Sequence, residues 1–133
     1  MEEYIVWNNQ SPGITFCENS GKITIFKKTL EAIGYPAYYR FLFDPDKNSF
    51  AVQSCEMEDE GAHKLPKLTR KGCCEISSLA LVRFVYRNCR WNMRISYRIP
   101  GEAVSGKNLI QFDLKAALEI HEGRLTEQKQ ISK

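Results

Sequence analysis

Hydrophobic and polar residues follow two different periods along this chain, and each period predicts one type of element. Alternating apolar and polar residues predict strands at 3–7, 14–16, 22–25, 38–43, 48–55, 74–76, 90–99 and 108–114. Apolar residues that recur three and four positions apart predict helices at 26–33, 79–89 and 115–123, although the first residues of the last segment could instead extend the strand before it. The chain is therefore expected to mix short strands with a few helices.

Turn-forming residues separate these elements. Gly34 and Pro36 are expected to end the first helix. Residues 100–107 begin with a Pro-Gly pair and predict a turn, and residues 62–72 have the composition of a linker. The polar tail at 124–133 is expected to fray.

The strand predicted at 90–99 has the strictest alternation in the chain. Its apolar residues are expected to share one face, and they are Trp91, Met93, Ile95, Tyr97 and Ile99. Arg94 and Arg98 then share the other face, which is expected to be exposed.

The order of predicted elements occurs twice, which indicates an internal repeat, although two unrelated segments could agree by chance. A strand, a helix and a hairpin occupy residues 21–65 and again residues 72–125. The spacing of Ile25, Leu30 and Ile33 recurs in Ile76, Leu81 and Phe84. We therefore predict an α+β fold in a single domain over residues 1–133, with two tandem strand–helix–hairpin repeats that share one core. Its sheet is expected to be antiparallel, with helices on one face.

Composition narrows the class of protein. The 133 residues are 43% hydrophobic and 26% charged, as in folded globular proteins. No apolar run approaches the roughly 20 residues that a membrane span requires, and the N-terminus does not resemble a signal peptide. The five cysteines are odd in number and form no CxxC pair, which favours a reduced compartment. We therefore expect a cytoplasmic protein with no membrane partner.

Charge is distributed unevenly along the chain. Residues 1–66 hold 6 Lys and Arg against 10 Asp and Glu, a balance of −4, whereas residues 67–133 hold 13 against 6, a balance of +7. A basic half attracts nucleic acid, acidic lipid or an acidic protein surface, and charge alone does not choose among them.

Arginines dominate the polar side of the helix predicted at 79–89. At 100° per residue, Arg83, Arg87 and Arg90 fall together, and no acidic residue lies on the helix to pair with them. If this stripe and the exposed face of Arg94 and Arg98 merge, five guanidinium groups form one patch for an anionic partner. The alternative is that acids of the first half, such as those in EMEDE (56–60), pair with them across the fold.

A second group of candidate binding residues lies in the first half. Arg40 shares a predicted strand face with Tyr38, an arrangement that single-strand binders use for stacking. Aromatic residues in such strands are more often core residues. Sequence therefore adds Arg40 as a candidate nucleic-acid contact and leaves the aromatic residues open.

Motifs for catalysis and for metal binding are missing from the sequence. It contains no GxSxG, HExxH or glycine-rich phosphate loop. Cys73 and Cys74 are adjacent, a spacing that suits no common zinc site, and no base is placed beside them for thiol catalysis. We therefore predict that the protein is not an enzyme and that it binds no cofactor and no metal. The remaining catalytic alternative is a thiol enzyme that uses Cys73 or Cys74.

The stretch GKITIFKKTLEAIG, residues 21–34, resembles the core motif of the AbrB/SpoVT-like swapped-hairpin transcription factors. In that family a Gly-Arg/Lys-Ile-Thr-Ile-Pro-Lys strand enters a short helix that ends near Leu-Gly, and a hairpin follows. The matching residues are Gly21, Lys22, Ile23, Thr24, Ile25, Lys27, Glu31, Ala32 and Gly34. Phe26 stands in place of the family's Pro, and Leu30 in place of its usual Arg. The resemblance covers residues 21–55, with a degraded second copy from near Gly72.

This resemblance implies a function in DNA binding. Members of the family are dimers whose intertwined strands present basic residues to DNA, and a tandem copy would form that arrangement within one chain. It implies that Lys22, Lys27 and Lys28 contact the DNA backbone, whereas the five arginines rest on the charge argument alone. We therefore predict a small, non-enzymatic, bacterial or phage-like DNA-binding regulator, monomeric or homodimeric. The rival prediction is an inhibitor or adaptor that docks its basic face on an acidic protein.

Overall fold

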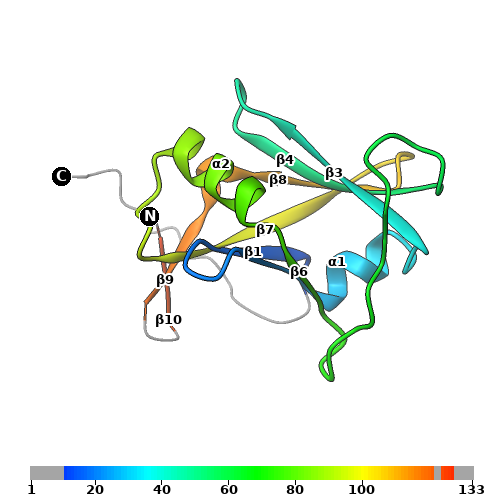
Figure 1. Ribbon diagram of the computed structural model, residues 1–133, viewed down its shortest axis with the longest axis horizontal. Coiled ribbons are helices and arrows are strands. Elements are labelled where there is room, and N and C mark those ends of the chain that lie inside the picture. The colour runs from blue at the N-terminus through cyan, green and yellow to red at the C-terminus, as the bar shows by residue number, and fades with distance from the viewer. Residues whose placement is uncertain (1–10, 122–123, 128–133) are drawn as a thin grey trace, which may run out of the picture.

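The computed structural model describes residues 11–121 and 124–127, and these residues form a strongly curled antiparallel sheet (Figure 1). Its ten strands are β1 (Gly13–Cys17), β2 (Lys22–Ile25), β3 (Tyr38–Asp44), β4 (Ser49–Cys55), β5 (His63–Lys64), β6 (Cys74–Ser77), β7 (Ser96–Val104), β8 (Leu109–Asp113), β9 (Leu118–His121) and β10 (Arg124–Glu127). The main path runs β5-β3-β4-β8-β7-β1-β2-β6, and β9 joins β7 to β10. The helices are α1 (Lys27–Ala32), α2 (Leu79–Cys89) and the 3-10 helix η1 (Leu114–Ala116).

The predicted fold class is wrong. The structure is mostly antiparallel strand, 42% against 18% helix, and its sheet curls into a half-barrel, so it is not an α+β strand–helix repeat with helices on one face. α1 has six residues and η1 has three, which leaves α2, with eleven, as the one substantial helix of the described part. None of the described helices is long and apolar enough to cross a membrane.

Two long-range strand pairings interlock the N-terminal and C-terminal halves of the described chain. β2 pairs antiparallel with β6, so that Ile23 lies opposite Ile76. β4 pairs antiparallel with β8, so that Phe50 lies opposite Phe112. Ile23, Phe50 and Phe112 are all fully buried. The two halves therefore share one core, because strands from both contribute to each half of the sheet.

β7 joins the two parts of the sheet by changing partners along its length. Residues 97–100 pair with β1, and residues 101–104 pair with β8. Gly101 lies at the change, where a Cβ atom would come within 2.6 Å of Ile110 Cγ2 and of Phe112 Cε1. The absence of a side chain at Gly101 lets β7 lie close to these core residues, as expected of a glycine inside a bent strand.

An aromatic cluster fills the space between the sheet and α2. Trp91 stacks on Tyr97, with ring centroids 4.3 Å apart, and Tyr86 of α2 meets Trp91 edge-on at 5.2 Å. Phe16 meets Phe50 edge-on at 5.3 Å. These five side chains are buried, and pairs of this geometry add to the free energy gained from burial alone.

α1 is fastened to β1 through one buried threonine. The backbone amide of Gly13 donates to Thr29 Oγ1 at 2.7 Å, and the same hydroxyl donates to the carbonyl oxygen of Gly13 at 2.9 Å. Thr29 is fully buried, so both hydrogen bonds are shielded from water.

Many of the predicted elements are confirmed. Strands occur where they were expected at 14–16, 22–25, 38–43, 48–55, 74–76 and 108–114, and helices occur at 26–33 and 79–89, within one or two residues of each predicted end. The linker prediction for 62–72 holds except for the two residues of β5. The strand predicted at 3–7 lies outside the described residues.

The first half of the strand predicted at 90–99 is wrong. Arg90 has a left-handed backbone, with φ of 57°, and Trp91 donates its amide to Tyr86 at 3.0 Å. Asn92 then accepts the amide of Arg94 through its side chain at 2.9 Å, which is the hydrogen bond of an Asx turn. Extended backbone therefore begins only at Ser96.

Three predictions near the C-terminus are also wrong. The turn expected at 100–107 is strand as far as Val104, because β7 continues through its Pro-Gly pair. The helix expected at 115–123 is replaced by η1 and β9, which pairs with β7. Residues 124–127 of the expected frayed tail form β10 against β9, while residues 128–133 lie outside the described part.

Candidate functional site

α2 carries most of the predicted binding residues and fixes their direction. Val82, Val85 and Tyr86 bury one side of the helix, and the Tyr86 hydroxyl donates to the carbonyl oxygen of Phe16 at 3.1 Å. The helix ends at Arg90 in a left-handed C-cap. Because the buried side is anchored to the sheet, the opposite side faces solvent along the edge of the molecule (Figure 1).

Arg83 and Arg87 lie one helical turn apart on the exposed side of α2. The Nε atom of Arg83 lies 3.1 Å from Glu18 Oε2 in the turn between β1 and β2, and the two side chains are 52% and 14% exposed. This pair answers part of the question left open by the sequence, because an acid of the first half compensates one arginine. That acid is Glu18 and not a residue of EMEDE.

Arg90 and Arg94 extend the row of arginines into the turn after α2, and both are exposed. In the part of the chain that the structure describes, no ion pair joins Arg87, Arg90 or Arg94 to an acid. The segment 76–95 contains these three residues and Arg83, and it contains no Asp or Glu. Three full positive charges and one compensated charge therefore lie along this edge.

Arg98 does not share this surface, so the predicted exposed face of Arg94 and Arg98 is wrong. Its side chain is 4% exposed and lies under the ring of Phe26, with Cζ 4.1 Å from the ring centroid. A Cβ atom on Gly13 would lie 2.5 Å from Arg98 Nη2, so the guanidinium also packs against that backbone. Burial lowers the pKa of Arg98 to about 10. Both faces of β7 are covered here, because Tyr97 and Ile99 are buried too.

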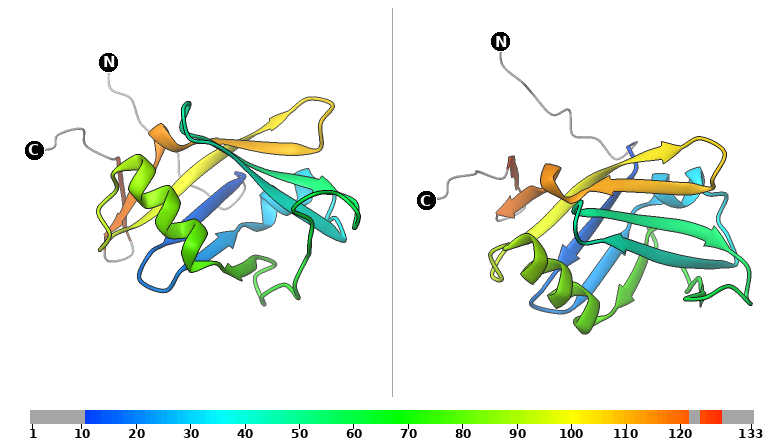
Figure 2. Two further views of the ribbon diagram at one scale, coloured as in Figure 1. Left: turned by 45° about the horizontal axis from the view of Figure 1, so that its top comes forward. Right: turned by 90° about the horizontal axis from the view of Figure 1, so that it is seen from above.

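The three lysines predicted to contact DNA lie on β2 and α1. Lys22 pairs with Glu75 at 3.5 Å, and Lys28 pairs with Glu31 at 2.9 Å. Figures 1 and 2 place α1, which carries Lys27 and Lys28, away from α2. Lys27 and Lys28 therefore do not join the arginines of α2 in one patch, whereas Lys22 lies opposite Ser77, next to the start of α2, and is paired with Glu75.

Arg40 is held on the hairpin of β3 and β4. Its Nε donates to Gln53 Oε1 at 3.0 Å, and its Nη1 donates to the carbonyl oxygen of Glu60 at 3.1 Å. These bonds use Arg40 to fix the loop after β4. The row on α2 is thus reduced to Arg83, Arg87, Arg90 and Arg94.

Exposed apolar side chains lie among these arginines, and the sequence did not predict them. Leu79 is 43% exposed, Phe84 is 48% exposed and Met93 is 45% exposed. Phe84 also packs edge-on against Phe43 of β3, with ring centroids 5.3 Å apart. The helical wheel could have shown that Phe84 lies off the buried stripe, whereas it places Leu79 beside Tyr86 at the edge of that stripe. We call Leu79, Arg83, Phe84, Arg87, Arg90, Met93 and Arg94 the α2 surface.

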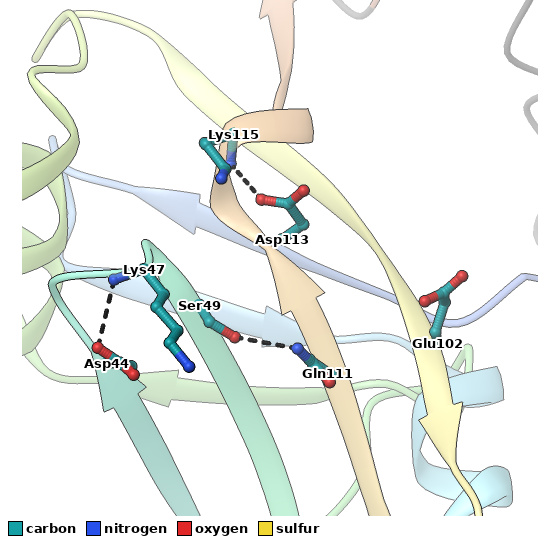
Figure 3. Close-up of a pocket in the computed structure, with 7 residues that line it drawn as sticks. All are labelled: Asp44, Lys47, Ser49, Glu102, Gln111, Asp113 and Lys115. Atoms are coloured by element: carbon teal, nitrogen blue, oxygen red, sulfur yellow. Dashed lines mark hydrogen bonds between the residues drawn. The ribbon is translucent and has the colours of Figure 1, made fainter.

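A separate polar depression of about 480 Å³ lies on the outer face of β3, β4, β8 and β7. Figure 3 shows its lining residues, which are Asp44, Lys47, Ser49, Glu102, Gln111, Asp113 and Lys115. Several of these residues make local hydrogen bonds: Asp44 accepts the amide of Lys47 at 3.3 Å, and Asp113 accepts that of Lys115 at 3.0 Å. The depression is open and mixes both signs of charge, so it selects no ligand class.

The cysteines are the residues to which the sequence left thiol chemistry open. All five are free thiols, and no group of three or more potential ligands could hold a metal ion among the described residues. Burial raises the pKa of Cys74 to about 11 and that of Cys89 to about 11. Burial also opposes ionisation of Cys17, but hydrogen bonds from Ser20 and Ser96 outweigh it and lower the pKa. Cys74 is therefore a poor nucleophile near neutral pH.

Comparisons with protein-family models, with curated proteins and with solved structures found no match for this chain. The resemblance of residues 21–55 to the AbrB/SpoVT-like domains therefore stays a prediction. The α2 surface must be interpreted from its own geometry and charge.

Proposed function

We propose that this chain is a non-enzymatic binding protein that holds duplex DNA through the arginines of its α2 surface. The observation that carries the proposal is the segment 76–95, with four arginines and no acidic residue. Guanidinium groups bind phosphate oxygens with two parallel hydrogen bonds, which suits an exposed arginine that has no acid beside it.

The geometry of α2 supports contact with the DNA backbone. Arg83 and Arg87 are four residues apart, or about 6 Å along the helix axis at the usual rise, and Arg90 and Arg94 continue the row. Arg83 is paired to Glu18, and the other three arginines form no ion pair within the described part of the chain. Contacts of this kind position a protein on DNA without reading its sequence.

The biological setting is part of the same proposal. We assign the chain to small bacterial or phage-like transcription regulators in the cytoplasm. Five free thiols suit a reducing compartment, and residues 21–55 resemble the AbrB/SpoVT-like regulators. Sequence choice would then come from the shape of the groove or from residues on the strands.

A second candidate function is supported by the apolar residues of the α2 surface. Leu79, Phe84 and Met93 expose nearly half of their area between the arginines. Arginine, methionine and aromatic residues are enriched in protein–protein interfaces. An adaptor or inhibitor that docks on an acidic protein would use this combination, whereas phosphate contacts gain nothing from the apolar side chains.

An electrophoretic shift with mixed-sequence duplex DNA at low salt tests the first candidate. Reversing two uncompensated charges, with Arg87→Glu and Arg94→Glu, should weaken the complex at least tenfold, or about 1.4 kcal/mol. The logarithm of the wild-type affinity should fall with the logarithm of the salt concentration with a slope of about −2.7, because three phosphates are neutralised at about −0.9 each.

The matched control reverses two exposed lysines outside the α2 surface, Lys67→Glu and Lys107→Glu. Its net charge equals that of the arginine variant, so long-range repulsion of DNA is the same in both. The proposal fails if the two variants lose affinity equally, or if the wild-type chain gives no shift. Met93→Ser separates the candidates, because it should leave a DNA complex unchanged and weaken docking on a protein.

A further inference from the structure

An acidic loop lies at the end of the molecule opposite the α2 surface. Residues 56–61, EMEDEG, follow β4 and carry four acids around Met57, which is 62% exposed. Figures 1 and 2 place this segment, between β4 and β5, far from α2. Among the described residues, no ion pair joins it to the arginines of the same chain.

The loop has a defined shape before any partner arrives. Asp59 accepts the amide of Glu56 through its side chain at 2.8 Å and donates its own amide back to the Glu56 carbonyl oxygen at 3.0 Å. Arg40 holds the Glu60 carbonyl oxygen at 3.1 Å. The Tyr38 hydroxyl lies 3.4 Å from the sulfur of Met57. A preformed loop loses less conformational entropy on docking than a free segment does.

The chemistry of the loop complements that of the α2 surface. Glu56, Glu58 and Glu60 are exposed, and their carboxylates form no ion pair with the residues that the structure describes. At the other end of the molecule, Arg87, Arg90 and Arg94 form no ion pair with any acid of the described residues. Each set of charges also surrounds exposed apolar area, Met57 on the loop and Phe84 with Met93 on the α2 surface. Opposite charges around apolar contacts are the usual arrangement of a specific interface.

We propose that a second copy of this chain docks its acidic loop on the α2 surface. The two contacting patches differ, so the contact is head-to-tail and leaves one loop and one α2 surface free at the ends of each pair. The docked loop covers the arginines that the proposed function assigns to DNA, so self-association would regulate access to them. In that respect alone the inference rests on the proposed function, because the association itself needs no DNA.

Sedimentation velocity of the pure protein tests the docking. At about 50 mM salt, where charges are weakly screened, the wild-type chain should exceed its monomer mass of 15.4 kDa as concentration rises. Higher salt should return it to the monomer. The variant Glu56→Gln, Glu58→Gln, Glu60→Gln should associate at least tenfold more weakly, and it keeps Asp59, which shapes the loop.

The matched control removes three exposed acids elsewhere, with Glu31→Gln, Glu75→Gln and Glu102→Gln. Both variants gain the same net charge, so a difference between them reports the place of the acids and not their number. The control should associate as the wild-type chain does. A wild-type chain that stays monomeric, or equal behaviour of the two variants, overturns the proposal.

Mixing two charge-reversed variants gives a second, independent test. Arg87→Glu with Arg94→Glu removes the basic character of the α2 surface and leaves the acidic loop intact, whereas Glu58→Arg with Glu60→Arg brings the net charge of the loop to zero and leaves the α2 surface intact. Each variant alone should be monomeric, and the equimolar mixture should associate because opposite patches meet again. A mixture that remains monomeric while the wild-type chain associates would show that another surface mediates association.

The two proposals can fail separately. A chain that associates in this manner but gives no shift with DNA refutes the proposed function and supports the docking. A chain that shifts DNA and stays monomeric supports the proposed function and refutes the docking. If both hold, the loop variant should bind DNA more tightly than the matched control at concentrations where the control associates.

Discussion

The hydroxyl of Thr29 should contribute measurably to stability, and replacing it with a methyl group tests this. Thr29→Val keeps the shape of the side chain and removes the acceptor of the Gly13 amide at 2.7 Å. It also removes the donor to the Gly13 carbonyl oxygen at 2.9 Å. That oxygen keeps the amide of Phe26 at 3.2 Å, so the main loss is one buried N–H without an acceptor.

The magnitude follows from that loss. An unsatisfied buried donor costs about 1–3 kcal/mol, and we expect about 2 kcal/mol for Thr29→Val because Gly13 and Thr29 are both buried. The matched variant Thr29→Ser keeps the hydroxyl and loses one methyl group, which costs about 0.8 kcal/mol of burial. Valine should therefore be more destabilising than serine, although it fills the site better.

Urea unfolding followed by circular dichroism measures both variants. The midpoint should fall further for Thr29→Val, with an unchanged m-value. Native-state hydrogen exchange should show faster exchange of the Gly13 amide in the valine variant, since its acceptor is gone. If Thr29→Ser is the more destabilised of the two, packing and not hydrogen bonding fastens α1 to β1, and our reasoning is refuted.

Three further predictions concern the core and its titration. Gly101→Ala should lower the free energy of unfolding by about 1–3 kcal/mol, because its Cβ would come within 2.6 Å of Ile110 and Phe112; an unchanged urea midpoint would contradict this. Tyr86→Phe should cost about 1–3 kcal/mol by leaving the Glu18 amide without the phenol oxygen at 3.3 Å, and a loss below that range in urea unfolding would count against the hydrogen bond. Stability should fall between about pH 9 and pH 11, because Cys74 and Cys89, with pKa of about 11 in the fold, keep protons that the unfolded thiols release near 9.0. Replacing both cysteines with alanine should flatten that pH dependence, and an unchanged slope would refute the assignment.

The local pattern of apolar and polar residues correctly predicted the elements whose ends are set by nearby residues. The apolar spacing of α2 is a property of eleven consecutive residues, and its predicted bounds are those of the structure. The strand at 22–25 is likewise correct. In both elements the buried positions recur with the same period as the apolar residues of the sequence, because one side of the element is buried and the other is not.

Prediction failed where distant residues decide the outcome. Residues 115–121 contain Ala116, Ala117 and Leu118, which favour a helix, but Leu118 lies opposite Arg98 in the pairing of β9 with β7. Strand pairing therefore overrides helix propensity there, and that pairing joins residues 20 apart in sequence or more. The Asx turn of Asn92 replaced a strand for a local reason that the alternation concealed.

Arg98 was assigned to the binding site because alternate residues of a strand share one face, and this assignment is wrong. Alternation places Arg94 and Arg98 on one side of a strand, and exposure follows only if that side meets solvent. Phe26, from the other half of the chain, covers Arg98 instead, and the segment of Arg94 is a turn.

The structure therefore leaves fewer arginines available to bind an anion than the sequence predicted. Of five predicted arginines, Arg98 is in the interior, and Arg83 is compensated by Glu18. The three that remain are enough for weak, salt-sensitive attachment to an anion, and too few for the tight non-specific binding that six or more phosphate contacts give. Any partner held firmly on the α2 surface must gain affinity from Leu79, Phe84 and Met93 as well, because these apolar groups supply contact area that salt does not screen.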